Sequence, residues 1–181
     1  MRAKVFRPVD DKKQRYKFDG HHKAHCNVAL VWIDLSGMFV RLDFSSKGSS
    51  NDRGIFNQTD PFLRPEEFFD GEQHVLCDSG FVGTGRVVCP YKRGSGHDVP
   101  NRAEINRDVR SQRWINEHCI AILKNKFRSF MGCWPWREEL WEVCLETVAM
   151  ISNFIWRKTG SRIVPPARRI MERENERLLR T

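Results

Sequence analysis

The segment from Arg110 to Phe130 constrains the fold more than any other part of this chain, because it contains neither proline nor glycine. Its apolar residues recur at the three- and four-residue spacing of a helix with one buried side. These residues are Ile115, Cys119, Ile122, Leu123 and Phe127. The opposite side carries one acid, Glu117, within a basic stripe made of Arg110, Arg113, Lys124 and Arg128. The segment predicts a long amphipathic helix whose polar side can contact an anion.

The basic stripe has a plain interpretation and a functional one. The plain one is a solvated helix face on which Arg113 and Glu117, four residues apart, add a few tenths of a kcal/mol, at about 0.2–0.5 kcal/mol for such a pair. The functional one is contact with a phosphate backbone, and composition favours it. The chain has 31 Lys and Arg against 23 Asp and Glu, a net charge of +8, which suits nucleic acid as a partner.

Four apolar runs predict strands. Residues 25–35 are apolar on both faces, and a turn at 34–37 joins them to residues 38–44 as a hairpin. Residues 74–77 form a short strand that ends on Asp78, and residues 87–91 form another extended piece. Strand ends in α/β folds open onto ligand-binding crevices, so Asp78 is placed where chemistry commonly occurs.

The two ends of the chain differ from its centre. Residues 1–23 are basic, with Pro8 against an early helix, and predict an extended or looped segment. Asn51 and its neighbours can cap a short helix through Phe56. A last helix is expected over 137–157, with a core face of Leu140, Trp141, Cys144, Leu145, Val148, Ile151 and Ile155. We therefore expect one domain over residues 1–158 and a charged tail over 159–181, in a chain of 181 residues that can bury one core.

Other residue patterns carry weaker signals. Six cysteines without a CxxC pair indicate reduced, buried thiols rather than a disulfide scaffold or zinc ribbon. His21, His22, His25 and Cys26 fit a polar strand start better than a zinc site. The tryptophans at 134, 136 and 141 fit packing between two helices better than base stacking. No apolar run is long enough to span a membrane, and no signal peptide is expected.

Several motifs in order resemble the catalytic core of Harbinger-type DDE transposases and their domesticated relatives. They include Asp78-Ser79-Gly80-Phe81, Pro90-Tyr91, Asn106, and Arg113 four residues before Glu117, followed by Leu123-Lys124 and Phe127. Upstream, His25, Asp34, Gly37 and the Gly48 to Asp52 segment also agree. The similarity covers roughly residues 5–158, and the ordered combination is specific where each motif alone is weak.

The resemblance implies an α/β fold, an RNase H-like mixed sheet flanked by helices, with the first strand missing or partial. It further implies a metal-dependent endonuclease and transposase core that performs phosphodiester hydrolysis and strand transfer. Asp78 and Glu117 would be catalytic ligands of Mg²⁺ or Mn²⁺, with Asp52 as a weaker candidate. Hard divalent ions prefer carboxylate oxygens, so these residue types suit such ions.

The family's first acid, in a D-G-T or D-C-T turn, would fall at or before Met1, and residues 1–9 contain no Asp or Glu. Because two carboxylates hold metal more weakly than three, we expect weak or no cleavage by this chain alone. The alternative is a non-catalytic, domesticated or degenerate module that binds DNA or protein. The resemblance also implies a nuclear location, DNA as partner, a Myb-like protein that recognises the target site, and a homo-oligomer.

Overall fold

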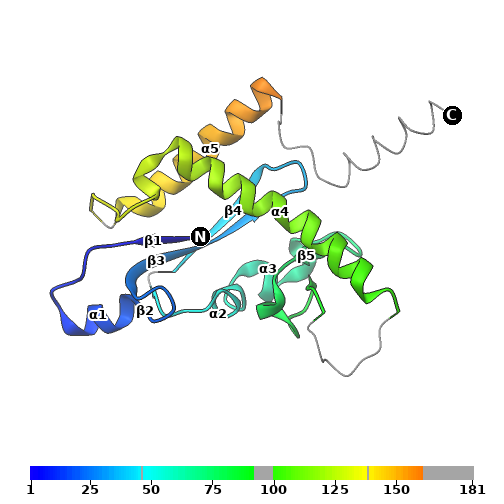
Figure 1. Cartoon of the computed structure of the whole chain (residues 1–181), viewed down its shortest axis with the longest axis horizontal. Helices are drawn as coiled ribbons and strands as arrows, with labels where there is room; N and C mark the ends of the chain where they lie inside the picture. Colours follow the sequence, from blue (N-terminus) through cyan, green and yellow to red (C-terminus); the bar gives the residue numbers. More distant parts are fainter. Residues whose placement is uncertain (46, 92–99, 138, 161–181) are drawn as a thin grey trace.

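The computed structural model describes residues 1–45, 47–91, 100–137 and 139–160 (Figure 1). The strands are β1 (Arg2–Lys4), β2 (Phe18–Asp19), β3 (Ala24–Ile33), β4 (Phe39–Ser45), β5 (Val75–Leu76) and β6 (Val87–Val88). The α-helices are α1 (Asp11–Lys17), α2 (Asp52–Phe56), α3 (Asp60–Leu63), α4 (Arg102–Lys126) and α5 (Leu140–Thr159). Three 3₁₀ turns are η1 (Pro65–Glu67), η2 (Ser79–Phe81) and η3 (Arg128–Phe130). The chain is thus a mixed α/β protein.

Strand β3 is the centre of the larger sheet. It pairs antiparallel with β4 through the expected hairpin, from Val28 opposite Ser45 to Ile33 opposite Phe39. On its other edge it pairs antiparallel with β1 and with the short β2. The hairpin forms because Asp34 accepts backbone hydrogen bonds from Ser36 and Met38 at 2.9 Å each, which closes the turn.

A second sheet consists of β5 and β6, which run parallel. A parallel pair needs a crossover, and here residues 77–86 with η2 provide it. The short helices α2 and α3 precede this sheet, and α2 packs against both β3 and η2. Asn51 caps α2 as expected, because its side chain accepts a hydrogen bond from the Gly54 amide at 2.6 Å.

The main core lies between the β3–β4 hairpin and the two long helices, which lie over it in Figure 1. From α4, Ile115, Cys119 and Leu123 enter this core and are each no more than 2% exposed, which confirms the predicted apolar face. Helix α5 adds Trp141, Leu145 and Trp156. The long helices therefore cover the sheet through the faces that their periodicity predicts.

Helix α4 begins eight residues before the predicted start at Arg110. Residues 102–109 do not show the apolar periodicity that predicts the helix from Arg110, because they include the charged residues Arg102, Glu104, Arg107 and Asp108. Val109 is buried, at 6% exposed, and extends the apolar side of the helix by two turns. The helix also ends at Lys126, and the following η3 replaces its predicted last turn.

The first 23 residues are more ordered than expected. Helix α1 forms after Pro8, because Asp10 accepts a hydrogen bond from the Lys13 amide at 2.8 Å and acts as its N-cap. The prediction of an extended or looped segment is therefore wrong over Asp11–Lys17. Proline stops a helix that runs through it, but it leaves the residues after it free to start one.

The core face of α5 is narrower than predicted. Leu140 and Ile151, both expected in the core, are 46% and 43% exposed. Ala149, Ser152 and Trp156 are buried instead, because α5 packs on both β4 and α4 and turns that side inward. Asn153 fixes this rotation: its amide accepts from the Phe39 amide and donates to the Phe39 carbonyl at 2.9 and 2.8 Å.

Trp134 and Trp141 are 2% and 1% exposed, which confirms their role in packing, whereas Trp136 is 56% exposed. The expected tail lies outside the described residues from 161 onward. Within the described ranges, no helix combines the length and apolarity that a membrane crossing requires.

All six cysteines are free thiols, as expected, but the expected burial is confirmed only for Cys26 and Cys119; Cys77, Cys89 and Cys144 are half-buried and Cys133 is exposed. Burial, with a smaller contribution from Asp34, raises the pKa of Cys119 to about 12. Burial, with smaller contributions from Cys89 and Asp78, raises the pKa of Cys77 to about 12. Because the thiolate is the reactive form, Cys133 should be labelled by a disulfide reagent at pH 8 while Cys77 and Cys119 are spared. Peptide mapping before and after denaturation checks this; rapid labelling of Cys119 in the folded chain would contradict it.

Candidate functional site

Asp78 follows β5 at the point where the strand ends, as predicted. It is the N-cap of η2, and its Oδ1 accepts a hydrogen bond from the Gly80 amide at 2.7 Å. The carboxylate is exposed. The cap explains why a short polar residue follows this strand, and it leaves the other carboxylate oxygen available to a ligand.

Glu117 lies on the solvent side of α4. Its side chain is 72% exposed, and the nearest ion pair joins its Oε1 to Nη2 of Arg113 at 3.9 Å. An exposed pair at this distance contributes little to stability, about 0.2–1 kcal/mol at most. Glu117 is therefore neither buried nor held in a network of ion pairs. The stability of the fold does not depend strongly on a glutamate at this position.

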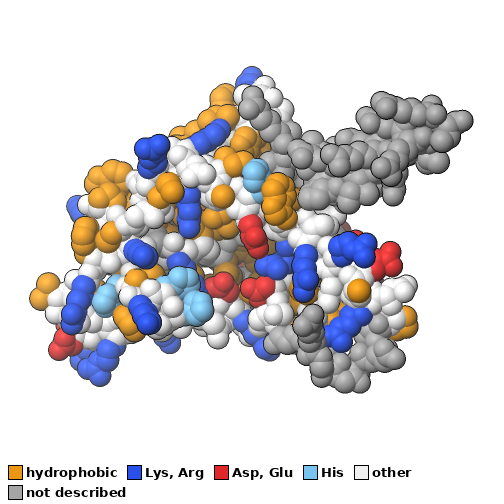
Figure 2. Space-filling model, in the orientation of Figure 1, with side chains coloured by type: hydrophobic (Ala, Val, Ile, Leu, Met, Phe, Trp, Pro, Cys, Tyr) orange, Lys and Arg blue, Asp and Glu red, His pale blue; other side chains and the backbone are white. Residues whose placement is uncertain are grey.

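A cavity of about 810 Å³ opens between β3, β5 and α4. Its apolar lining comes from both strands and from Phe56, Phe68 and Ile115. Asp78, Asp52 and Arg113 also line it, whereas Glu117 lies one helical turn beyond Arg113 and does not. Figure 2 shows a hollow below α4 with apolar side chains inside and charged side chains around it. The structure thus brings Asp78 and Arg113 to one cavity.

Two strand edges flank this cavity without a partner among the described residues. Strand β1 pairs only with residues 26–28 of β3. Residues 30–33 of β3 extend beyond the start of β1 and pair only with β4. Strand β5 pairs only with β6. Leu30–Ile33 and Val75–Cys77 all line the cavity. The groove therefore has the apolar walls and open edges that an additional strand would need.

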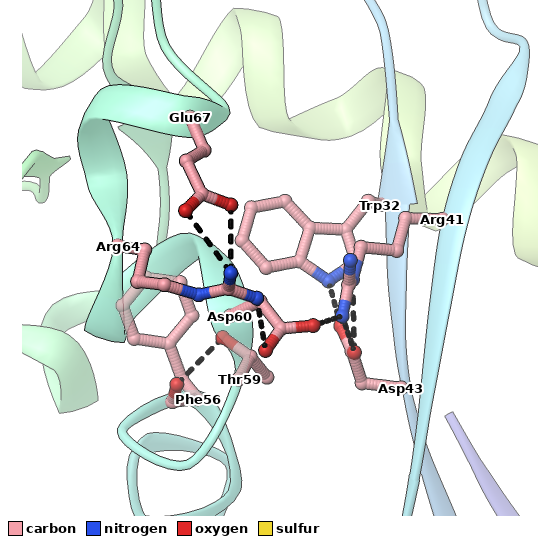
Figure 3. A network of polar contacts seen from close by, with 8 residues as sticks. All are labelled: Trp32, Arg41, Asp43, Phe56, Thr59, Asp60, Arg64 and Glu67. Carbon is pink, nitrogen blue, oxygen red and sulfur yellow. Dashed lines mark hydrogen bonds and ion pairs between the residues drawn. The ribbon is translucent and has the colours of Figure 1, made fainter.

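A polar network behind the cavity wall joins the β3–β4 hairpin to α3 (Figure 3). Asp43 accepts a hydrogen bond from the Trp32 indole at 2.7 Å and pairs with Arg41. Arg41 reaches on to Asp60 at 3.3 Å, which also pairs with Arg64. Trp32 stacks on Phe56 at 5.5 Å between ring centres. The network ties the hairpin to the short helices and so keeps this wall in place.

Asn106, one of the residues in the sequence pattern, has a structural role. Its amide accepts from the Tyr91 amide at 2.7 Å and donates to the Tyr91 carbonyl at 3.1 Å. Helix α4 is thereby fastened to the chain that follows β6. Arg113 and Glu117 lie two and three turns after Asn106 on α4, so this contact helps to set their positions relative to Asp78.

Gln112 and Asn116 also line the cavity, and sequence reasoning missed them. They lie four residues apart, and at about 100° per residue both fall on the same side of α4 as Ile115, Cys119 and Leu123. The available signal was a pair of amides at helical spacing on the apolar side of the helix, where uncharged groups that can donate and accept hydrogen bonds are out of place unless they meet a ligand or a polar partner.

The remaining predicted residues are spread over the surface. Arg110 and Arg128 are exposed, and Lys124 is half-buried. Lys and Arg side chains lie along the course of α4 in Figure 2. Asp52 is held by the Arg2 guanidinium at 3.2 Å, so it is already paired. Arg128 belongs to η3 rather than to α4, which separates it from the stripe by the helix end.

Within the described parts of the chain, no group of three or more His, Cys, Asp or Glu side chains is placed to hold a metal ion. This applies equally to the histidines at 21, 22 and 25, where His22 pairs instead with Asp19 at 2.9 Å. Carboxylate oxygens at Asp78 and Glu117 have the right chemistry for Mg²⁺ or Mn²⁺. Their number and placement do not fit an ion without a further ligand.

Comparison with known proteins adds one match. The family model described as DDE superfamily endonuclease matches residues 2–153. No curated protein and no solved structure matches the chain.

Proposed function

Because this chain belongs to the DDE superfamily endonuclease family, we propose that it is the core of a Harbinger-type transposase or transposase-derived nuclease. Its reaction is hydrolysis of DNA phosphodiesters, followed in a transposase by strand transfer. Asp78 and Glu117 are the acids of this site. The observation that carries the proposal is the cavity between β3, β5 and α4, with Asp78 and Arg113 in its lining.

Each described residue has a separate task in this proposal. Asp78 presents a carboxylate at a strand end, where the η2 cap fixes its direction. Glu117 presents a second carboxylate on α4, one turn from Arg113. Arg110, Arg113, Lys124 and Arg128 place the phosphate backbone, since guanidinium and ammonium groups bind phosphate oxygens. Gln112 and Asn116 offer uncharged hydrogen-bonding groups inside the cavity.

The acid set is completed, in our proposal, by a strand that lies in the groove in line with β1. Such a strand would pair antiparallel with β3 and alongside β5, which joins the two sheets into the single RNase H-like sheet. An acid on it would face the cavity that Asp78 lines. Divalent metal would supply Lewis-acid chemistry only in this completed site, because the described donors alone do not fit an ion.

An engineered extension ahead of Met1 tests the proposal. We expect that about ten residues of alternating Val and Thr that end in the sequence Asp-Gly-Thr and continue directly into β1, enough for one strand, will produce Mn²⁺-dependent nicking of plasmid DNA. The same extension with Asn in place of Asp is the matched control and should remain inactive. Adding Asp78→Asn to the active form should abolish nicking, since Asn keeps the η2 cap but removes the charge. Equal nicking by the Asp and Asn extensions would contradict the proposal.

The second candidate function is DNA binding without cleavage, and the incomplete acid set favours it for the chain as it stands. Three cations on α4, with Arg128 just beyond its end, predict a steep salt dependence, a loss of about 100-fold in affinity for duplex DNA between 50 and 200 mM salt.

The variant Arg110→Gln/Arg128→Gln should lower the salt slope by about 2. The matched control is Arg157→Gln/Lys158→Gln, which removes the same charge from the end of α5 and should bind as the native chain does. Fluorescence anisotropy over a salt series measures both. Affinity that does not change with salt would contradict this function.

DNA as substrate implies action in the nucleus. We propose that a Myb-like partner selects the target site and that the chain works as a homo-oligomer, as the family resemblance implies. Size-exclusion chromatography with light scattering, with and without duplex DNA, tests the assembly. A monomer under both conditions would contradict it.

A further inference from the structure

An aromatic pair on α4, the exposed Trp114 and the half-buried His118, is not used by the cleavage site. The rings of Trp114 and His118 stack with centres 4.5 Å apart and planes 18° apart. Trp114 is 44% exposed, whereas Trp134, Trp141 and Trp156 are all below 10%. A tryptophan that packs on a helix neighbour leaves a large, flat apolar surface in water, and burial in the core does not explain it.

The pair lies within the charged face of α4. At about 100° per residue, Trp114 is about 40° round the helix from Arg110 and about 60° from Glu117. Arg107, two turns before Trp114, lies about 20° from it. Arg107 and Arg110 are both exposed. A flat ring, two cations and the candidate acid therefore share one side of one helix.

We infer that Trp114, held by His118, is a stacking platform for an unpaired base of DNA, with Arg107 and Arg110 on the adjacent phosphates. The inference rests on the proposed function, because it places this base on the same side of α4 as Glu117, one of the two acids of the proposed site. Aromatic faces stack any base, and cations at the same groove follow the backbone. The i,i+4 spacing fixes the indole plane, so little side-chain freedom is lost when a base stacks on it.

The ligand is single-stranded rather than duplex DNA for a geometric reason. In a duplex each base has both faces covered by its neighbours, and only edges reach the grooves. A base can offer a face to Trp114 only when it has left the stack, at a single-stranded end or a flipped nucleotide. Strand cleavage creates such ends, so the platform lies where unpaired bases would be handled.

The test compares two labelled single strands of about 12 nucleotides, a length within the range of known single-strand sites. One is oligo-dT and the other has the same phosphates with abasic sugars. By fluorescence anisotropy, the native chain should bind oligo-dT about tenfold more tightly than the abasic strand, and Trp114→Ala should remove that difference. Trp114→Phe should retain most of it. Trp136→Ala, the change of a tryptophan that is 56% exposed, is the control and should behave as native.

Two failures are distinguishable. If Trp114→Ala and the native chain prefer oligo-dT equally while duplex binding persists, the platform is wrong and the nucleic-acid function stands. If the native chain binds neither single strands nor duplex at low salt, the proposed function fails and the platform fails with it. Circular dichroism melts confirm that each variant is folded.

Discussion

Truncating Leu123 to alanine should lower the free energy of unfolding by about 2–5 kcal/mol, the usual cost of a buried Leu truncation. Leu123 is 1% exposed and packs in the core cluster with residues from β4 and α5. The lost methyl groups leave a cavity because Ile115 and Trp134 are already fixed by their own contacts. Urea denaturation followed by circular dichroism measures the change.

The matched comparison is Glu117→Gln on the same helix. Its carboxylate is 72% exposed and 3.9 Å from Arg113, so its replacement should change stability by less than about 0.5 kcal/mol. If Glu117→Gln costs as much as Leu123→Ala, Glu117 has a structural role and its assignment to the DNA site is wrong. A large difference between the two variants would agree with Glu117 being kept for function.

Replacing Asp19 by alanine should cost about 3 kcal/mol at pH 7, since it leaves Arg2 without its buried partner. Asp19 Oδ2 lies 2.8 Å from the Arg2 Nε, and Oδ1 accepts from the His21 and His22 amides. Arg2 keeps its second partner, Asp52, at 3.2 Å, which holds the cost toward the lower end of the range for buried pairs. Thermal melts give the change.

The effect should depend on pH in one direction. Burial alone raises the pKa of Asp19, but hydrogen bonds from His22 and the charge of Arg2 outweigh it, so the folded pKa is lowered. A lowered carboxyl pKa gives stability above the unfolded value of about 3.9, and that stability is lost as pH falls through the folded pKa. The difference between native and Asp19→Ala should therefore shrink below about pH 4. A difference that stays constant from pH 7 to pH 3 would contradict this account.

The sequence by itself determined the elements with strong periodicity. The β3–β4 hairpin, the buried face of α4 and the position of Asp78 at the end of β5 follow from alternation, from helical spacing and from a turn residue after a strand. These are local patterns, in which each residue's neighbours along the chain predict its environment. The family match over residues 2–153 also agrees with motifs that could be read along the chain.

Tertiary contacts decided the rest. Leu140 and Ile151 have the apolarity of core residues, but α5 packs on β4 and α4 with another side and leaves them exposed. Gln112 and Asn116 became cavity residues only because β5 and β3 lie apart beside α4. Glu117 lies outside the cavity lining, because the burial of Ile115, Cys119 and Leu123 turns its side of α4 toward solvent. Spacing along a helix determines which residues share a side, but only packing against distant strands determines which way that side faces.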